Sequence, residues 1–168
     1  MNQAILLNFL VDKENKKIKV RRSFDASLPI VWQAWTDAEI LDQWWAPHPW
    51  KNKTISMDFR EGGRWFYVMR SPEHTEAHWC LVNFTTIVHH KHFASEDAFC
   101  NEKGEIDLSF PSNKWETQFT STEEQTLVNL TLSFEKVEDL EAMIQMGFKE
   151  GLTKGLEQLD EWLKQQNR

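Results

Sequence analysis

The sequence predicts an α+β fold in which an antiparallel sheet is closed by a long C-terminal helix. Apolar residues recur at every second position in several stretches of the region 51–134, which is the period of strands with one buried face. Alternation of this kind is typical of an antiparallel sheet whose other face is in water. Two short helical patterns precede that region, and residues 137–165 repeat apolar side chains at three-to-four spacing.

The chain opens with a predicted hairpin and two short helices. Alternating apolar residues on both sides of a polar turn predict the hairpin within 5–24. Ser27 can cap a first helix that carries Pro29 in its first turn, where a missing amide proton is tolerated. A second helix start follows at 36–37, and Pro47 ends that helix because proline disfavours helix in the residue before it.

The middle of the chain predicts further strands and one long loop. The expected strands are a hairpin of 55–57 and 65–69 around a Gly62-Gly63 turn, followed by 76–84, 86–93, 114–120 and 127–134. The stretch between His92 and Lys114 is rich in turn residues, and its length indicates a lid or a lip rather than a tight hairpin.

Three glycines mark the final helix. Gly147, Gly151 and Gly155 recur four residues apart, and each costs about 1 kcal/mol relative to alanine inside a helix. Close packing of the helix on the sheet explains such a stripe. Alternatively, the missing side chains leave room for a cavity between helix and sheet, and both explanations can hold along one helix.

Composition narrows the class of protein. The 168 residues fit a single domain that spans 1–168, and 19 Lys and Arg against 26 Asp and Glu give a net charge of −7, which disfavours nucleic-acid binding. Two cysteines are too few for a secreted disulfide scaffold. No stretch approaches 18 apolar residues, so we expect a cytoplasmic protein without a membrane span. Neither the composition nor any motif indicates an oligomeric state.

Three motifs resemble one family across nearly the whole chain. They are 35–47 (WTDAEILDQWWAP), 58–65 (DFREGGRW) and 147–152 (GFKEGL). Together they are similar to homologues of the C-terminal domain of the activator of the ninety-kilodalton heat-shock protein's ATPase, within the START-like (SRPBCC) superfamily. The resemblance implies a helix-grip fold, in which a curved antiparallel sheet wraps around the long C-terminal helix and two short helices follow the first hairpin.

The resemblance also implies a range of functions. Superfamily members bind lipids, steroids or polyketides, and a few catalyse ring closure or hydrolysis in the same cavity. The name of the family suggests a chaperone partner and a role in the stress response. The eukaryotic co-chaperone binds its chaperone through a separate N-terminal domain, and residues 1–168 contain no counterpart of that domain. We therefore expect a small hydrophobic ligand rather than a chaperone partner.

We expect the ligand to contact aromatic and thioether side chains on inward strand faces and on the glycine-bearing helix. The predicted lining is Trp65, Tyr67, Met69, Trp79, Trp115, Phe119, Met143, Phe148 and Leu152. The Tyr67 hydroxyl and the Trp79 indole are the expected orienting groups. This choice places Trp79 and Leu81 on the inward face. A shift by one residue would invert it and bring His78 inward.

Catalytic and metal motifs are absent from the sequence. It contains no nucleophile elbow, zinc-protease or dinucleotide-binding fingerprint, so we expect neither a cofactor nor a metal and favour a protein that is not an enzyme. Candidate acids or bases are Glu76, Asp97 and Asp58, and Asp58 more plausibly pairs with Arg60. The histidines 89, 90 and 92 could supply two metal ligands on one strand face, with no third ligand at a defined spacing.

Three hypotheses follow, in order of preference. The first is a carrier of a lipid-like or polyketide-like ligand. The second is a chaperone-associated interaction module that uses the sheet or the segment 44–50, rich in Trp and Pro, as its docking surface. That segment could instead plug the core or line the cavity entrance. The third is a cyclase-like or hydrolase-like enzyme.

Overall fold

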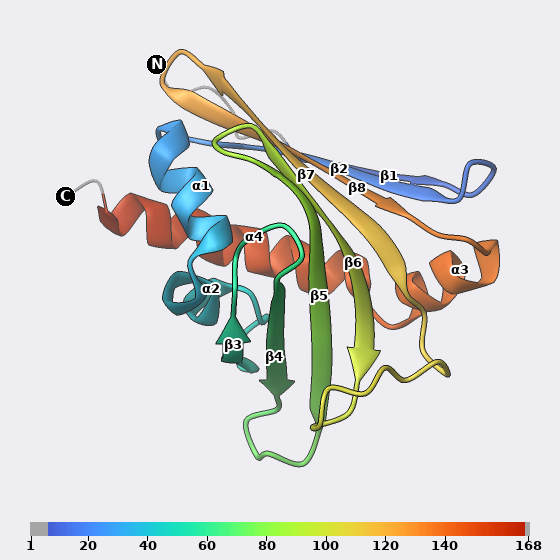
Figure 1. Cartoon of the computed structure of the whole chain (residues 1–168). Helices are drawn as coiled ribbons and strands as arrows, with labels where there is room; N and C mark the ends of the chain where they lie inside the picture. The colour runs from blue at the N-terminus through green and yellow to red at the C-terminus, as the bar shows by residue number, and fades with distance from the viewer. Residues whose placement is uncertain (1–6, 167–168) are drawn as a thin grey trace.

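The computed structural model describes residues 7–166 and shows one curved sheet around a C-terminal helix (Figure 1). Ile5, expected in the opening strand, lies outside the described residues. The elements in chain order are β1 (Leu7–Asp12), β2 (Lys17–Phe24), α1 (Leu28–Thr36), α2 (Ala38–Trp44), β3 (Lys51–Met57), β4 (Arg64–Arg70), β5 (Ala77–Val88), β6 (His92–Cys100), β7 (Asn113–Thr122), β8 (Gln125–Ser133), α3 (Val137–Gln145) and α4 (Phe148–Gln166).

All eight strands form one antiparallel sheet in the order β1-β2-β8-β7-β6-β5-β4-β3. Strand β2 pairs with β8, so the N-terminal hairpin joins the C-terminal strands, while β3 lies at the opposite edge. The sheet curves around α4, and α1 and α2 cover one end of the same face (Figure 1). This arrangement is the helix-grip fold, and it confirms the predicted α+β class.

Local chemistry explains the two short helices. The Asp37 carboxylate accepts hydrogen bonds from the backbone N–H groups of Glu39 and Ile40, at 2.9 and 3.4 Å, and thereby caps α2. Pro29 lies in the first turn of α1, as predicted, although the Ser27 side chain makes no capping hydrogen bond. The indole N–H of Trp44 donates to the Ala34 carbonyl at 3.0 Å and ties the end of α2 to α1.

The final helix is broken rather than continuous, which corrects the prediction of one helix over 137–165. Helix α3 ends at Gln145 and α4 begins at Phe148. Gly147 lies between them with a φ of 89°, a left-handed conformation that glycine adopts without a steric penalty. The apolar period continues across the break, so periodicity alone did not reveal it.

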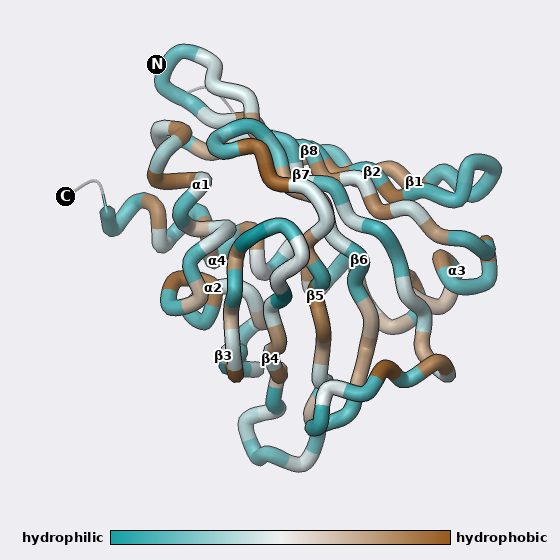
Figure 2. Tube along the Cα trace, in the orientation of Figure 1, coloured by the Kyte–Doolittle hydropathy of each residue, from teal (hydrophilic) through white to brown (hydrophobic). Residues whose placement is uncertain are grey.

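The strand boundaries differ from the prediction around the histidines. Strand β5 is continuous from Ala77 to Val88, with a register shift between Phe84 and Thr86, where two separate strands were expected. His92–Cys100 forms strand β6 inside the stretch expected to be a loop, so the loop itself covers only 101–112. That loop displays exposed apolar residues at one end of the sheet, seen in brown in Figure 2.

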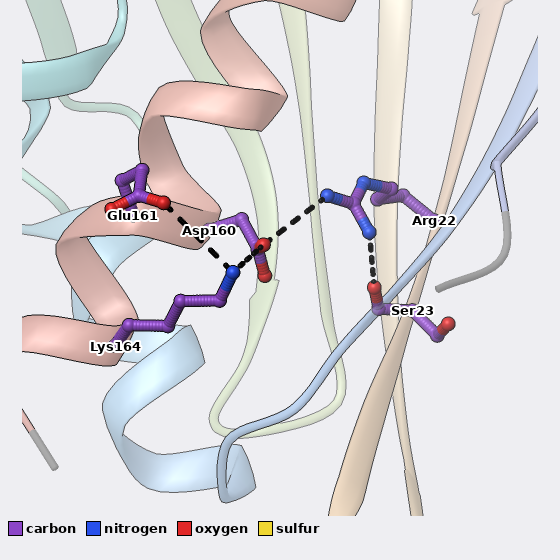
Figure 3. A network of polar contacts seen from close by, with 5 residues as sticks. All are labelled: Arg22, Ser23, Asp160, Glu161 and Lys164. Atoms are coloured by element: carbon purple, nitrogen blue, oxygen red, sulfur yellow. Dashed lines mark hydrogen bonds and ion pairs between the residues drawn. The ribbon is translucent and has the colours of Figure 1, made fainter. Parts of the chain in front are cut away.

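The packed core lies between the sheet, α1, α2 and the second half of α4. Leu156, Leu159 and Leu163 of α4 are at most 2 % exposed, and Trp44 is 1 % exposed. A network of polar contacts fixes the same half of α4 to the sheet (Figure 3). Arg22 of β2 lies 3.9 Å from the Asp160 carboxylate, and its guanidinium donates to the Ser23 carbonyl at 2.8 Å.

Candidate functional site

A cavity of about 390 Å³ lies between the sheet and the first half of α4. Its walls come from β4, β5, β6 and β7 on one side and from α3, α4 and the segment 44–50 on the other. The lining residues are Trp44, Trp45, Pro47, Trp50, Tyr67, Met69, His78, Cys80, Leu81, Val82, Asp97, Ala98, Phe99, Pro111, Asn113, Trp115, Met143, Met146, Gly147, Phe148, Gly151, Leu152 and Gly155.

The strand register decides which side chains face the cavity. Tyr67 pairs with Cys80, and Cys80 pairs with Phe99, so these three residues form one row on the same face. The neighbouring row runs from Val82 through Asp97 to Asn113. Directly paired residues on one face have Cβ atoms about 5 Å apart, so neighbouring side chains within each row are close enough to contact one another.

The glycines of the helix pair explain why space remains. A Cβ atom on Gly151 would meet only the Pro47 Cγ atom at 3.8 Å, and one on Gly147 would meet nothing within 4 Å. A Cβ atom on Gly155 would lie 3.4 and 3.5 Å from the backbone oxygens of Trp44 and Trp45. Gly155 therefore serves close packing, while Gly151 borders open space. Gly147 is a helix-breaking residue and not part of a continuous stripe.

Six of the nine predicted lining residues border the cavity. They are Tyr67, Met69, Trp115, Met143, Phe148 and Leu152. These six residues belong to β4, β7, α3 and α4, so both walls of the cavity contain predicted residues.

Trp79 does not border the cavity, which corrects the predicted inward face of β5. It pairs with Val68 and packs with Phe66 and Leu81 in a separate cluster on the opposite face of the sheet. Its ring also lies 5.3 Å from the Arg70 guanidinium. Strand β5 carries apolar side chains on both faces, so hydropathy could not distinguish the two registers. The one-residue shift considered as the alternative is the correct one, and it brings His78 inward.

Trp65 and Phe119 face inward but lie in the packed core beyond the cavity. The Trp65 indole donates a hydrogen bond to the Thr54 hydroxyl at 2.9 Å and stacks on Tyr67 at 4.1 Å between ring centroids. Phe119 packs against Trp32 at 5.0 Å. Trp65 therefore supports the cavity wall through Tyr67, whereas Phe119 packs against a residue that is not part of that wall, and neither ring borders the cavity.

Several lining residues escaped the sequence-based prediction for identifiable reasons. Phe99 and Asn113 fall in the stretch that was expected to be a loop, although Phe93, Ser95, Asp97 and Phe99 alternate along β6. Cys80 was missed because the register of β5 was inverted. The alternation along β6 was the one sequence signal that could have found the first of these residues.

Asp97 is the carboxylate that borders the cavity. It accepts a hydrogen bond from the Ser95 hydroxyl at 2.6 Å. Burial raises the pKa of Asp97 to about 7, and the hydrogen bond from Ser95 opposes this rise. The other two candidate carboxylates lie elsewhere. Asp58 pairs with Arg60 at 2.7 Å, as expected, and Glu76 is exposed in the turn before β5.

Two neutral groups share the inner wall with Asp97. Burial raises the pKa of Tyr67 well above its ordinary value, and the neighbouring Cys80 raises it further. Burial likewise raises the pKa of the Cys80 thiol to about 12, opposed by a hydrogen bond with Tyr67. Both side chains are therefore uncharged at neutral pH.

The cavity also contains polar atoms without well-formed partners. The Oδ1 atom of Asn113 is buried and accepts no hydrogen bond, and the residue as a whole is 8 % exposed. The Trp45 indole N–H is buried without a well-formed hydrogen bond, although it lies close enough to the Tyr67 hydroxyl to lower the pKa of that group. A ligand with complementary groups would satisfy atoms that the protein leaves unpaired.

Aromatic rings form a chain along one rim of the cavity. Trp50 stacks on His78 with 5.3 Å between ring centroids, and His78 lies 6.3 Å from Phe99. Phe99 contacts Phe110 of the 101–112 loop at 5.4 Å. This loop thus lies at the cavity rim, in the place expected of a lip.

The segment 44–50 serves two of the three roles considered for it. Trp44 is buried in the core and also borders the cavity, as do Pro47 and Trp50. Gln158 of α4 holds the segment in place, because its amide donates to the carbonyls of Trp44 and Ala46 at 3.0 and 2.8 Å. None of the three indoles in the segment is exposed, which disfavours an aromatic docking patch.

The histidine group does not form the arrangement that was considered for metal binding. His89 and His90 lie in the turn between β5 and β6 and stack on each other at 3.8 Å beside Trp32. Within residues 7–166, no group of three or more His, Cys, Asp or Glu side chains could hold a metal ion. In the same range, none of the helices is both long and apolar enough to cross a membrane.

Comparison with known proteins identifies the family. The family model described as "Activator of Hsp90 ATPase homolog 1-like protein" matches residues 25–164. The chain belongs to this family. Membership in the Activator of Hsp90 ATPase homolog 1-like family confirms the resemblance inferred from the three sequence motifs, and the match covers every element from α1 to nearly the end of α4. No curated protein matches the sequence significantly.

Solved structures show the same fold over more than nine-tenths of each chain. Protein Ms6760 from Mycobacterium smegmatis aligns with a TM-score of 0.87 at 22% identity and covers 95% of this chain and 97% of its own. A protein from Arthrobacter aurescens aligns with a TM-score of 0.88 at 28% identity, covering 94% and 91%. One from Staphylococcus epidermidis aligns with a TM-score of 0.81 at 26% identity, covering 93% and 94%.

Proposed function

We propose that this protein binds a small hydrophobic or amphipathic molecule in the cavity between the sheet and the first half of α4. The observation that carries the proposal is the 390 Å³ cavity itself, bordered by aromatic and thioether side chains at the point where Gly151 leaves room. A core that only needed to be packed would have a larger side chain there, since open space forgoes dispersion contacts.

Burial of apolar area supplies the driving force. Each square ångström of apolar surface removed from water contributes about 25 cal/mol, so a ligand that buries roughly 250 Å² gains about 6 kcal/mol before immobilisation costs. Met69, Met143 and Met146 line the same cavity, and flexible thioether side chains adapt to ligands of different shape. These features favour a carrier of lipid-like or polyketide-like molecules.

A neutral fluorescent probe tests the proposal. Titration with N-phenyl-1-naphthylamine should give saturable enhancement of probe fluorescence and a change in tryptophan emission, because Trp45, Trp50 and Trp115 border the cavity. Gly151→Phe should reduce probe affinity at least tenfold while leaving the circular dichroism spectrum unchanged. The phenyl ring would occupy the cavity, and the backbone at this position has room for a Cβ atom. Undiminished probe binding by a folded Gly151→Phe variant would count against the cavity as the site.

Chaperone-associated interaction is the alternative that the family description suggests. It requires a docking surface, and the aromatic segment 44–50 is held against α4 by Gln158 rather than displayed. The alternative is tested by adding the protein to the ninety-kilodalton heat-shock protein and measuring ATP hydrolysis. Our proposal predicts no stimulation, and a stimulation that survives Gly151→Phe would favour the docking role.

An enzyme of the cyclase or hydrolase kind has one observation in its favour, the position of Asp97 on the cavity wall. A general acid or base also needs a reacting partner in reach. Tyr67 and Cys80, its titratable neighbours, both have raised pKa values, and within residues 7–166 neither donates a hydrogen bond to Asp97. The arrangement therefore supports ligand orientation more directly than catalysis.

A further inference from the structure

Two hydrogen-bond acceptors lie side by side at the inner wall of the cavity. Asp97 of β6 and Asn113 of β7 are directly paired across the two strands and both border the cavity. Of the described residues, only Ser95 donates a hydrogen bond to Asp97. The accepting atom is Oδ1 of the Asp97 carboxylate. The Asn113 Oδ1 atom receives none, although this atom is buried and the residue is more than nine-tenths buried. Buried acceptors of this kind are normally satisfied, which points to a missing donor.

The electrostatic surroundings indicate what kind of donor would fit. No Lys or Arg side chain is among the described residues that border the cavity, so Asp97 has no counter-charge there. The other titratable groups on the lining are Tyr67, Cys80 and His78; α3, α4 and the segment 44–50 add none. An anionic ligand would meet a carboxylate and no cation, whereas a cation with several N–H donors would satisfy both acceptors.

We propose that the ligand carries a protonated amine, which Asp97 and Asn113 bind at the inner wall while its apolar body lies against α4. The inference rests on the proposed binding function and specifies the chemical class of the ligand. An ammonium group has three donors and no acceptor, so one head group can reach the Asp97 carboxylate and the Asn113 carbonyl oxygen together. Phe148 and Leu152 then cover the apolar part.

A matched series of naphthalene compounds tests the inference by displacement of bound N-phenyl-1-naphthylamine. 2-Naphthylmethylamine, 2-naphthalenemethanol and 2-naphthoate share one ring system and differ in the polar group. At pH 8 we expect the amine to bind at least tenfold more tightly than the alcohol, and the carboxylate most weakly. An amine that binds no more tightly than the alcohol would overturn the inference.

Substitution of Asp97 assigns the preference to this residue. Asp97→Asn should lower amine affinity at least tenfold and leave the affinities of the alcohol and the fluorescent probe within twofold. An amine preference that persists in the folded variant would contradict the assignment. Asn113→Leu, which removes the second acceptor, should lower amine affinity by a smaller factor and serves as an independent variant.

The pH dependence of the wild-type protein provides a test that needs no variant. The pKa of Asp97 is about 7, so the carboxylate is largely protonated at pH 5.5 and ionised at pH 8. Amine affinity should therefore rise severalfold between these values while alcohol affinity stays level. Tyr67 and Cys80 stay neutral throughout, and comparison with Asp97→Asn separates any contribution from His78. A flat pH profile for the amine would contradict the inference.

The series separates this inference from the proposed function. If the fluorescent probe binds and Gly151→Phe blocks it, but the amine has no advantage, only the assignment of the polar group fails. If the probe does not bind the wild-type protein at all, the binding function fails and the amine inference fails with it.

Discussion

The two halves of α4 contact the same sheet in different ways. The second half is packed: Leu159 and Leu163 are fully or almost fully buried, and Asp160 pairs with Arg22 (Figure 3). The first half borders the cavity through Gly151 and Leu152. A single amphipathic helix therefore closes the core at one end and leaves a ligand-sized space at the other.

The polar groups show the same contrast. Near the packed half, Gln158 makes three hydrogen bonds to the segment 44–50, and Arg22 is paired. Near the cavity, Asn113 and Trp45 have buried polar atoms without well-formed partners, and Asp97 has a raised pKa. Within residues 7–166, two of the four buried side-chain atoms without a partner belong to residues on the cavity wall, Asn113 and Trp45, whereas those of Trp35 and Asn52 do not border the cavity.

Leucine truncation in each half should give the largest difference. Leu159→Ala removes a fully buried side chain and should lower the free energy of unfolding by about 3 kcal/mol. Leu152→Ala, on the half-buried cavity wall, should cost less than about 1 kcal/mol, because the adjoining space already exists. Urea denaturation measures both. Equal losses would mean that the two halves are packed alike.

Removing the Asp97 charge should stabilise the protein in a pH-dependent way. The folded-state pKa of about 7 lies above the unfolded value of 3.8, so the wild type loses stability as pH rises from about 4 to 7 and then levels off. Asp97→Asn should therefore be more stable than the wild type at pH 8 by about 2 kcal/mol. This is about half of the free energy that the whole pKa difference would give, because Asp97 is partly exposed and solvent reduces the effect.

Asp107→Asn is the control for this effect. Its carboxylate accepts hydrogen bonds from Ser109, which lower its pKa, so its substitution should not stabilise the protein at pH 8. Thermal unfolding at pH 4, 6 and 8 gives the comparison. An Asp97→Asn variant that gains nothing between pH 4 and pH 8 would show that the carboxylate is not held in an unfavourable environment.

The ion pair of the packed half should contribute a smaller amount. Asp160→Asn leaves the Arg22 guanidinium buried without its counter-charge and should cost about 1.5 kcal/mol, less than a closely paired buried ion because the separation is 3.9 Å. Lys164→Gln removes an exposed partner of the same carboxylate and should cost less than about 0.5 kcal/mol. Equal losses of stability in the two variants would mean that the buried pair with Arg22 contributes no more than the exposed pair with Lys164.

Alanine substitution of the two helical glycines should give the smallest and most local contrast. Gly151→Ala gains helix propensity without a close contact and should stabilise the protein by about 0.7 kcal/mol. Gly155→Ala places its methyl group 3.4 Å from the Trp44 backbone oxygen, which should cancel that gain. Chemical denaturation distinguishes the two, and an equal gain at both sites would remove the argument for close packing at Gly155.

Sequence reasoning reached the fold because several levels of pattern agreed. The alternation along β8 and the helix start at 36–37 each indicate the observed element, and the helical period over 137–165 indicates helix where α3 and α4 lie. The break at Gly147 escaped detection because apolar residues keep the same spacing on both sides of it. A stripe of glycines predicts close packing and free space equally well, and only the surrounding backbone distinguishes Gly155 from Gly151.

The site was harder to predict than the fold because it depends on strand register. Trp79 and Leu81 were as plausible an inward face as Cys80 and Val82, since all four are apolar and adjacent. The pairing of Tyr67 with Cys80 decides the matter, and this pairing is a property of the assembled sheet. Asn113 gave no sequence signal, because its importance comes from the partner that it lacks.

Nuclear magnetic resonance mapping of probe binding is the most direct test of the cavity. In an ¹⁵N-labelled sample, N-phenyl-1-naphthylamine should shift the backbone amide signals of Phe148, Gly151 and Leu152 and leave those of Leu159 and Leu163 unchanged. That result would place the ligand beside the first half of α4. Shifts confined to the opposite face of the sheet, around Trp79, or spread evenly along α4 would contradict the account.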